Sequence, residues 1–358
     1  MAGIFDSLQS GVFREERVLL PEYQPPQLMF RQEQVQTIAR CVQGVARGQP
    51  PQSVFIYGPT GTGKTTASRL VLTELSEFTE KAVTAYVNCW ETYSRQAVFS
   101  AIADQIGEAL PKRGIGADEI FSRIVQRLKY DNKSCIVVLD EADRVATGEA
   151  SSVLYELSRA SENHGASFGL VLVSNVPDLA ANLDSRIRSS LRLEKVEFKK
   201  YLPSQLKDIL SARAKDAFMP NVASDEIIGL CAAFGAKAGG DARVALEALW
   251  KAGRNAEKRG AKRIEESDVR ASYSESGEWK KEQRLSGVSE PERIVLDILS
   301  KSGEITSGEL YEKYMKLNGE SERQIRNYVN ALEKRKLVSV RESQTESGRG
   351  KTRLVKLA

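Results

Sequence analysis

One glycine-rich stretch of the chain has residue types at a spacing that can do chemistry. It consists of Gly58, Pro59, Thr60, Gly61, Thr62, Gly63, Lys64 and Thr65, with Thr66 following, and it fits the phosphate-binding pattern G-x-x-x-x-G-K-[ST]. Such glycines let backbone N–H groups turn inward around a phosphate, and a following helix N-terminus adds partial positive charge. Lys64 can then reach the β- and γ-phosphates of a nucleotide, and the Thr65 hydroxyl can ligate Mg²⁺.

The alternative for this stretch is a glycine-rich turn with a surface lysine, and the flanking sequence argues against it. The apolar, β-prone segment Ser53–Tyr57 precedes the loop, and Thr66–Phe78 carries leucines without a helix breaker. A strand, a glycine loop and a helix N-terminus are the context in which a phosphate-binding loop works.

An acidic turn follows farther along the chain. Asp140 and Glu141 come directly after Cys135–Leu139, an apolar run typical of a buried parallel strand. Carboxylates at that strand end lie where the Mg²⁺ and the attacking water of a nucleotide site would be. Asp140 suits Mg²⁺ binding, and Glu141 suits orienting or deprotonating the water. Asn175, after the next apolar run, can hydrogen-bond the γ-phosphate or the water, although alone it would be an ordinary turn residue.

The elements that must position these residues alternate between strands and helices. The expected strands are Ser53–Tyr57, Val83–Asn88, Cys135–Leu139, Phe168–Ser174 and Leu191–Phe198. The expected helices are Phe30–Arg47, Thr66–Phe78, Val98–Leu110 and Asp118–Tyr130. This alternation predicts an α/β fold, a five-stranded parallel sheet with helices on both faces. The proline-containing arm before it, Leu20–Pro26, either covers a nucleotide base or is a solvent-exposed leader.

The β signal ends near Tyr201, and a helical region follows. Its expected helices are Gln205–Ala217, Ser224–Phe234, Ala242–Arg259 and Glu265–Ser274, separated by prolines and glycines. They predict a small helical domain. Arg243 can reach back from it to the nucleotide, although an arginine on a solvated helix face is the ordinary alternative. Residues 276–287 are polar and contain glycine, as expected of a linker.

The C-terminal segment has a different pattern. Three capping boxes mark three helix starts, at Ser289 with Glu292, Thr306 with Glu309, and Ser321 with Gln324. Two β-prone segments, Leu337–Arg341 and Thr352–Lys356, flank a glycine-containing loop and predict a hairpin. Three helices followed by a hairpin describe a winged helix-turn-helix.

The third of these helices presents a polar side able to hydrogen-bond bases or phosphates, made of Arg323, Gln324, Arg326 and Asn327. Residues 334–356 contain eight basic residues against two acidic ones, which favours a phosphate-binding surface over a merely solvated one. Those of the predicted wing are Arg349, Lys351 and Arg353. Winged helices also serve as protein–protein modules, so that alternative stays open, with DNA favoured.

Composition limits the class of protein. A chain of 358 residues predicts two or three domains, and 41% hydrophobic with 28% charged residues is normal for a soluble protein. We expect no transmembrane helix and no secretory signal, because long apolar runs are missing from the sequence. Four scattered cysteines and one histidine predict a reduced, intracellular protein without a zinc site. The net charge of +4 is small, so a nucleic-acid signal has to be local.

Together these motifs resemble one family, the AAA+ initiators of archaeal DNA replication, relatives of the eukaryotic origin-recognition and helicase-loading ATPases. The resemblance covers nearly the whole chain. The phosphate-binding loop and acidic turn fit any AAA+ protein. The segment Leu183–Leu191, the motif Gly240-Asp241-Ala242-Arg243 and the terminal winged helix, in this order, are more specific.

By that resemblance, Asn175 is the sensor 1 residue and Arg243 the sensor 2 arginine. Arg186, with Arg188 as the alternative, is the arginine finger that acts on a second protomer. The implied domains are a nucleotide-binding base domain at 1–199, a helical lid domain at 200–280, and a winged-helix DNA-binding domain at 281–358. A helical insertion at about 90–116 resembles the initiator-specific insertion that contacts DNA, with Lys112 and Arg113 as its phosphate partners.

The resemblance implies a replication initiator that binds ATP or ADP with Mg²⁺ and hydrolyses ATP slowly, as a conformational switch. Its implied partners are double-stranded origin DNA, the minichromosome-maintenance helicase and a second initiator protomer on DNA, in the cytoplasm and associated with the nucleoid. A clamp-loader-like remodelling ATPase is disfavoured, because a winged helix stands where an oligomerisation collar would be. A DNA-binding regulator that keeps the nucleotide as structure stays open, since sequence does not report turnover.

Overall fold

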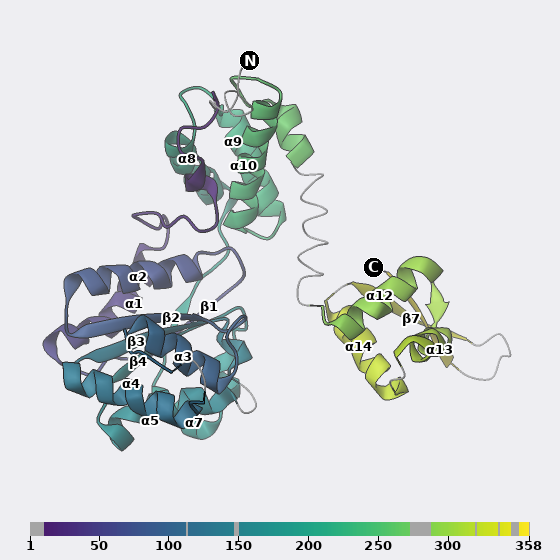
Figure 1. Ribbon diagram of the computed structural model, residues 1–358. Helices are drawn as coiled ribbons and strands as arrows, with labels where there is room; N and C mark the ends of the chain where they lie inside the picture. Colours follow the sequence, from purple (N-terminus) through teal and green to yellow (C-terminus); the bar gives the residue numbers. More distant parts are fainter. Residues whose placement is uncertain are drawn as a thin grey trace, which may run out of the picture. The chain divides into compact units, whose positions relative to one another are not determined.

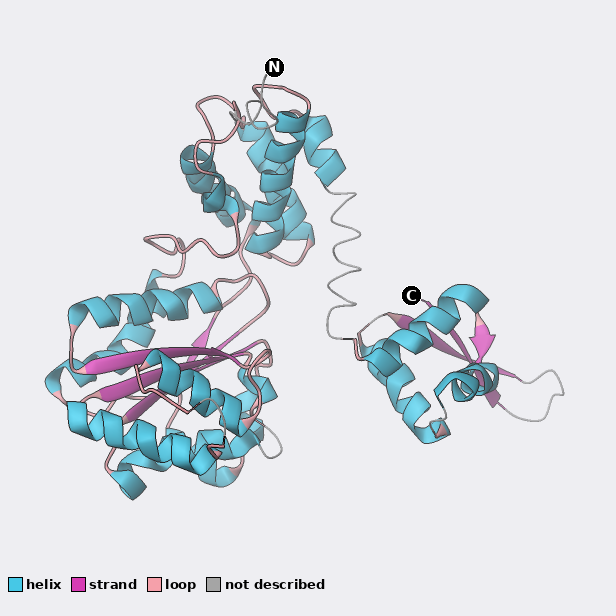
Figure 2. Cartoon of the chain, viewed as in Figure 1, coloured by secondary structure: helices cyan, strands magenta, loops and turns pink. Residues whose placement is uncertain are grey.

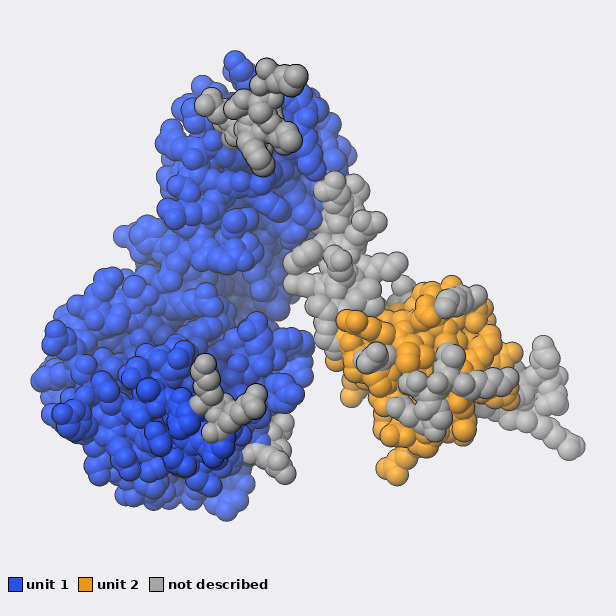
Figure 3. Space-filling view, in the orientation of Figure 1, with its two compact units in different colours: residues 1–272 blue, residues 273–358 orange. Residues whose placement is uncertain are grey.

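The structure is a computed structural model that describes residues 11–111, 114–146, 150–272, 288–318, 321–335, 337–344 and 351–357. The chain divides into two compact units, Met1–Ser272 and Tyr273–Ala358, which Figure 3 shows in two colours. Among the described residues, we find no helix with the length and apolar character needed to cross a bilayer.

The first unit contains a five-stranded parallel sheet in the order β2-β3-β4-β1-β5, which confirms the predicted α/β sheet. Its strands are β1 (Val54–Tyr57), β2 (Ala82–Asn88), β3 (Ser134–Asp140), β4 (Phe168–Ser174) and β5 (Glu194–Glu197). The pairing of Tyr57 with Ser174, and of Asn88 with Asp140, brings the carboxyl ends of neighbouring strands to one edge. The loops that follow these strands therefore meet there.

Helices cover both faces of this sheet (Figure 1). On one face lie α1 (Gln32–Val42) and α2 (Lys64–Phe78); on the other lie α3 (Arg95–Gln105), α4 (Ala117–Asp131), α5 (Ser151–His164) and α7 (Ser185–Leu191). Alternate residues of the central strands supply the two cores, Val137 and Leu139 to one, Ile136 and Val138 to the other. Burial on both faces explains why β3 is a continuous apolar run.

One expectation for this sheet is wrong in detail, and one helix beside it was not expected. The fifth strand begins at Glu194 and not at Leu191, because α7 occupies Ser185–Leu191. Asp184 caps that helix, accepting from the Arg186 N–H at 2.8 Å, and Arg192 ends it in a left-handed conformation. The motifs also do not predict α5, although its buried apolar side chains have helical spacing.

A helical lid completes the first unit. It contains α8 (Pro203–Ala217), α9 (Asp225–Lys237), α10 (Ala242–Lys258) and a helix at 266–272. The N-terminal arm packs on it through the short helix η1 (Glu16–Leu19), and Val12, Val18 and Leu19 are buried in the lid core. A bridge between Phe13 and Phe218 adds backbone pairing. Residues 12–19 therefore anchor the arm on the lid.

The second unit is a winged helix (Figure 2), as the sequence predicts. It contains α12 (Glu290–Ser302), β6 (Ile305–Thr306), α13 (Ser307–Asn318), α14 (Glu322–Lys334), β7 (Val338–Gln344) and β8 (Lys351–Leu357). The strands pair antiparallel in the order β6-β8-β7. The predicted capping boxes at Ser289 and Ser321 are present. At Thr306, the side chain of Glu309 accepts from both the N–H and the hydroxyl.

Candidate nucleotide-binding site and nucleic-acid surface

The glycine-rich loop follows β1 and leads into the N-terminus of α2, as the phosphate-binding pattern requires. Its glycines take positive φ angles, 142° at Gly58, 68° at Gly61 and 93° at Gly63. Close packing adds a second constraint. A Cβ at Gly61 would meet the Asp241 carboxylate of the lid at 1.7 Å, so a side chain there would collide with the lid.

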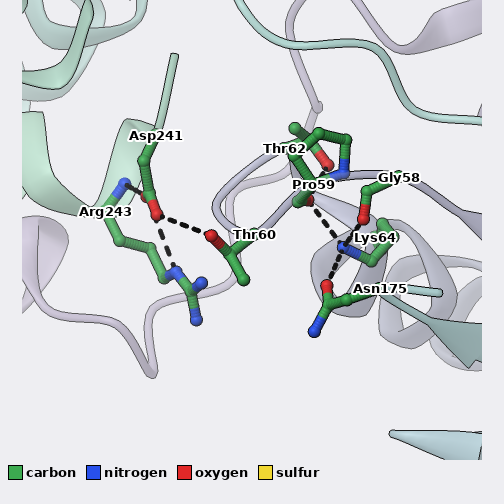
Figure 4. A network of polar contacts seen from close by, with 8 residues as sticks. All are labelled: Gly58, Pro59, Thr60, Thr62, Lys64, Asn175, Asp241 and Arg243. Atoms are coloured by element: carbon green, nitrogen blue, oxygen red, sulfur yellow. Dashed lines mark hydrogen bonds and ion pairs between the residues drawn. The ribbon is translucent and has the colours of Figure 1, made fainter. Parts of the chain in front are cut away.

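Lys64 lies buried at the base of this loop (Figure 4). Its Nζ donates at 2.7 Å to three oxygens, the carbonyls of Gly58 and Pro59 and the Oδ1 of Asn175. Burial lowers the pKa of Lys64 to about 8, against the opposing effect of Glu141 and Asp140. The ammonium thus lies within a cradle of backbone and side-chain dipoles at the helix N-terminus, where phosphate oxygens bind.

Asp140 and Thr65 are joined, as a Mg²⁺ site would require. The Thr65 hydroxyl donates to Asp140 Oδ2 at 2.7 Å, and the Glu141 N–H donates to Asp140 Oδ1 at 3.0 Å. Because the Thr65 hydroxyl donates its hydrogen bond to the carboxylate, the lone pairs of its oxygen stay available to a hard cation. The described residues contain no cluster of three or more His, Cys, Asp or Glu side chains suited to a metal. The two residues fit a Mg²⁺ that takes its remaining ligands from phosphate and water.

Asp140 has a further donor that was not expected from the sequence. The Tyr86 hydroxyl also donates to Oδ2, at 2.7 Å. Burial and the Asp140 carboxylate raise the pKa of Tyr86, so its hydroxyl remains a proton donor. A tyrosine inside a predicted strand gives no sign of this contact, which depends on β2 pairing with β3.

Glu141 and Asn175 lie together beside Lys64. Asn175 Nδ2 donates to Glu141 Oε2 at 3.2 Å, while the Oδ1 of the same amide accepts from Lys64. Glu141 has a left-handed backbone with φ 54°, which turns its side chain out of the strand line. Burial, with the carboxylates of Asp140 and Asp143, raises the pKa of Glu141. A raised pKa suits a carboxylate that accepts a proton from water.

The lid reaches the phosphate-binding loop through the start of α10. Asp241 accepts from the Thr60 hydroxyl at 3.3 Å, and the Ala242 N–H donates to the Gly61 carbonyl at 3.1 Å. Asp241 also accepts from the Arg243 N–H at 2.9 Å and lies 3.7 Å from its Nε (Figure 4). Arg243 therefore borders the site, and about half of its side chain is exposed. From this motif only Arg243 was expected at the site, and the contacts of Asp241 with the loop were not expected.

A cavity of about 760 Å³ extends from the loop between the base and the lid. Its wall includes arm residues 20–23 and 25–29 and lid residues of α8 and α10. The predicted site residues that line it are Thr65, Thr66, Asp140, Glu141, Asn175 and Arg243. The arm thus forms part of the wall of this cavity.

Arg31 is a third residue whose role was not expected from the sequence. It is buried, its Nε donates to the Thr62 carbonyl at 3.0 Å, and its other nitrogens donate to the carbonyls of Phe30 and Lys199. Its guanidinium lies 4.0 Å from the centroid of the Tyr201 ring. Arg31 therefore ties the phosphate-binding loop to the segment that leads into the lid. An arginine before a helix carries no sequence signal for this role.

Arg186 lies elsewhere. It is on α7, about three quarters exposed, and pairs with Asp184 at 3.2 Å. It does not line the cavity that contains Lys64. The structure therefore does not bring Arg186 to this chain's own phosphate-binding loop.

The polar side of α14 is exposed, while Ile325, Val329 and Leu332 are buried. Arg323, Gln324, Arg326 and Asn327 all lie on that exposed side. Gln324 also accepts from the Ser321 hydroxyl at 2.9 Å, and Arg326 pairs with Glu322 at 3.2 Å, so contacts with DNA would compete with these bonds.

Of the wing, the structure describes residues 337–344 and 351–357. Arg353 is exposed on β8, and Lys351 begins that strand. Arg335 and Arg341 pair within the domain, with Glu292 and Glu304, which lowers the local surplus of free positive charge. Three candidate DNA contacts, Lys112, Arg113 and Arg349, lie outside the described residues.

Comparisons with known proteins agree with this architecture. Residues 47–183 match a model described as an AAA domain, and residues 207–274 match the Cdc6 AAA+ ATPase-type lid domain. The ORC1-type DNA replication protein 1 of Sulfolobus acidocaldarius is 32% identical over 376 aligned residues, covering 100% of this chain and 94% of that protein.

Two solved structures are similar over almost the whole chain. The Aeropyrum pernix ORC1 protein in complex with DNA has a TM-score of 0.85 and 32% identity, covering 98% of this chain and 94% of that one. The Aeropyrum pernix ORC2 protein, in ADPNP–ADP complexes, has a TM-score of 0.67 and 25% identity, with coverages of 97% and 94%.

Fold and site define the first unit as an AAA+ ATPase domain with its lid, and the second as a winged helix. The chain belongs to the ORC1-type family of DNA replication proteins, relatives of Cdc6. The resemblance inferred from the motifs is confirmed.

Proposed function

We propose that this protein is an ATP-dependent initiator of DNA replication that binds double-stranded origin DNA and helps to recruit or load the replicative minichromosome-maintenance helicase. One observation carries the proposal: the chain is similar over its whole length to an ORC1 protein whose structure was solved in complex with DNA. Its cellular location would be the cytoplasm, associated with the nucleoid.

The nucleotide site supports an ATP or ADP switch. Lys64 and the loop glycines would hold the phosphates, and Thr65 with Asp140 would hold Mg²⁺. The metal would supply charge neutralisation for the β- and γ-phosphates. Glu141 accepts the proton of the attacking water, and Asn175 keeps the Glu141 carboxylate beside that water through its 3.2 Å hydrogen bond. We expect slow turnover, because the output is a change in domain arrangement.

Two arginines complete the proposed ATPase cycle. Arg243 borders the cavity from α10 and serves as sensor 2, so that the lid responds to the γ-phosphate. Arg186 serves in trans as the arginine finger of a neighbouring protomer, which its exposure on α7 supports. The domain boundaries proposed for this machinery are 1–199 for the base, 200–280 for the lid and 281–358 for the winged helix.

The trans assignment of Arg186 has a direct test. Arg186→Ala should bind ATP as the wild type does and lose any turnover that a second protomer stimulates. The measurement is turnover against protein concentration, with and without duplex DNA. Wild-type turnover that stays constant on dilution to monomer would contradict the assignment.

The proposed DNA contact uses two parts of the chain. In the winged helix, Arg323, Gln324, Arg326 and Asn327 would contact bases, and Arg349, Lys351 and Arg353 would contact phosphates. In the ATPase domain, Lys112 and Arg113 would contact phosphates. Each phosphate contact steepens the log–log dependence of affinity on salt by about 0.9.

A salt titration of duplex binding tests this division. The full chain is compared with a variant that lacks residues 286–358, which should bind weakly and keep a salt-sensitive residual affinity. Arg353→Ala should weaken binding on all sequences and lower the slope by about one, whereas Asn327→Ala should erode sequence preference. A truncated protein that does not bind DNA at low salt would leave the winged helix as the whole DNA-binding surface.

Mapping the DNA bound by this protein across the genome of its host tests the origin function itself. Peaks confined to replication start sites are expected. Peaks at promoters would identify a DNA-binding regulator that keeps the nucleotide as structure, and would overturn the initiator proposal.

A further inference from the structure

Tyr86 lies beside the phosphate-binding loop on a strand that supplies none of the motif residues. It belongs to β2, which is at the edge of the sheet and pairs with β3 so that Asn88 lies opposite Asp140. From there its hydroxyl donates to Asp140 Oδ2 at 2.7 Å. Thr65 donates to the same oxygen, also at 2.7 Å. Two hydroxyl donors thus converge on one carboxylate oxygen.

Three separate contacts hold Tyr86 in this place. The side-chain amide of Gln105, on α3, accepts from the Tyr86 N–H at 2.8 Å and donates to its carbonyl at 2.9 Å. These bonds satisfy backbone groups on the open edge of β2. The Arg69 guanidinium lies 4.3 Å from the ring centroid, and Arg69 is one helical turn after Thr65 on α2. The ring is therefore fixed between the helix of Thr65 and the strand neighbouring Asp140.

The donors limit what Asp140 can still bind. A carboxylate offers about two lone pairs on each oxygen. Among the described residues, Tyr86 and Thr65 occupy Oδ2, and the Glu141 N–H occupies one position on Oδ1. Without the Tyr86 hydroxyl, only the Glu141 N–H and the Thr65 hydroxyl itself hold the carboxylate. The orientation of the carboxylate is then less restricted, and the acceptor that directs the Thr65 hydroxyl is less fixed.

We propose that Tyr86 is a positioning residue for the Mg²⁺–nucleotide site, acting through Asp140 to fix the orientation of the Thr65 hydroxyl. This inference rests on the proposed nucleotide function of the site. Outer hydrogen-bond partners of metal ligands typically contribute 10- to 100-fold to metal affinity. Tyr86 should affect nucleotide binding only when Mg²⁺ is bound, because its hydroxyl contacts Asp140 and none of the loop groups that would hold phosphate.

The test is a Mg²⁺ titration of the full chain with a fluorescent ADP analogue, comparing wild type with Tyr86→Phe. The phenylalanine keeps the ring against Arg69 and removes one hydroxyl. We expect about the same ADP-analogue affinity in EDTA, and a Mg²⁺ concentration for half-maximal enhancement that is raised about tenfold. Tyr130→Phe is the matched control, since Tyr130 is 89% exposed and should behave as wild type.

Three outcomes would overturn the inference. An unchanged Mg²⁺ midpoint in Tyr86→Phe would show that the hydroxyl does not position Asp140. An equal loss of affinity with and without Mg²⁺ would show a role in packing alone. A wild-type protein that does not bind the ADP analogue would remove the proposed nucleotide function, and with it this inference; the wild-type titration separates that case from the other two.

Discussion

The two ends of the cavity in the first unit are held by different kinds of contact. At the phosphate end, Lys64, Thr65, Asp140 and Asn175 form short polar bonds among loops that meet at one sheet edge. The remaining wall, called here the enclosing end, includes the arm, which contacts the lid over long sequence separations. The Trp250 indole donates to Glu16 at 2.6 Å across 234 residues.

The two ends therefore have different roles: the phosphate end performs the chemistry, and the arm encloses the ligand. Side chains at the phosphate end are buried or partly buried and are held by short hydrogen bonds. Replacing one of them should therefore change the charge or the proton transfer at the site without moving its neighbours. Buried apolar side chains and a few partly exposed polar contacts fix the arm to the lid, so weakening one of the polar contacts should change the rate at which a bound ligand dissociates. Substitutions at the two ends should therefore alter different properties, and four of them, in order of decreasing effect, test this difference.

Glu141→Gln should have the largest effect, about a thousandfold on ATP hydrolysis. The amide keeps the size and the hydrogen bond to Asn175 but cannot accept a proton from water. Nucleotide affinity should stay within about twofold, because Glu141 does not form the phosphate cradle. Single-turnover hydrolysis and calorimetric binding measure the two effects. Hydrolysis at the wild-type rate would remove Glu141 from the mechanism.

Lys64→Ala should lower nucleotide affinity about a hundredfold or more. It removes the buried ammonium from the phosphate cradle, and a preorganised charged donor in such a site contributes about 3 kcal/mol. Lys195→Ala, on exposed β5, is the matched control and should bind as the wild type does. Equal affinity of Lys64→Ala and Lys195→Ala in calorimetry would contradict the role of Lys64.

The phosphate end could be predicted from sequence because its residues lie in short segments of fixed geometry. The loop spacing, the acidic turn after an apolar run and an asparagine at the next strand end identify Lys64, Asp140 and Asn175, and the structure brings them together. The enclosing end could not be predicted in this way. Arg31 and the arm act through backbone carbonyls and packing, which any sequence can offer.

Secondary structure shows the same limit. The apolar run of β3 was predictable because both faces of the sheet are buried. The start of β5 was not, because the cap at Asp184 turns the preceding residues into helix α7. The helical spacing of the apolar residues of α14 predicts which of its sides faces solvent. The pairing of Arg335 with Glu292 could not be predicted, because it depends on the tertiary fold.

Arg31→Lys tests the contacts by which Arg31 links the phosphate-binding loop to the segment that leads into the lid. It should lower the free energy of unfolding by about 2 kcal/mol. Lysine keeps the charge but cannot donate to the Thr62, Phe30 and Lys199 carbonyls together, and each buried acceptor left unsatisfied costs about 1–3 kcal/mol. Urea unfolding measures the change. Arg40→Lys, an exposed position on α1, is the control. Equal stability of the two variants would contradict the assignment.

Glu16→Gln should give the smallest effect, at the enclosing end. Glu16 fixes the arm to the lid, accepting from Trp250 at 2.6 Å and pairing with Arg254 at 2.7 Å. The glutamine keeps an acceptor for the indole and loses the ion pair, which costs about 1 kcal/mol because both side chains are partly exposed. A fluorescent ADP analogue should then dissociate about fivefold faster, at an unchanged association rate in stopped flow.

Glu15→Gln separates the anchor from the loss of a negative charge. Glu15 is the neighbouring residue and pairs at 2.7 Å with Arg17, within the arm itself. Its substitution changes the net charge equally and leaves the contacts with Trp250 and Arg254 in place, so dissociation should stay at the wild-type rate. Equal acceleration in both variants would mean that charge near the cavity sets the release rate. The arm would then enclose the ligand without retaining it, and the two ends of the cavity would no longer differ in what they control.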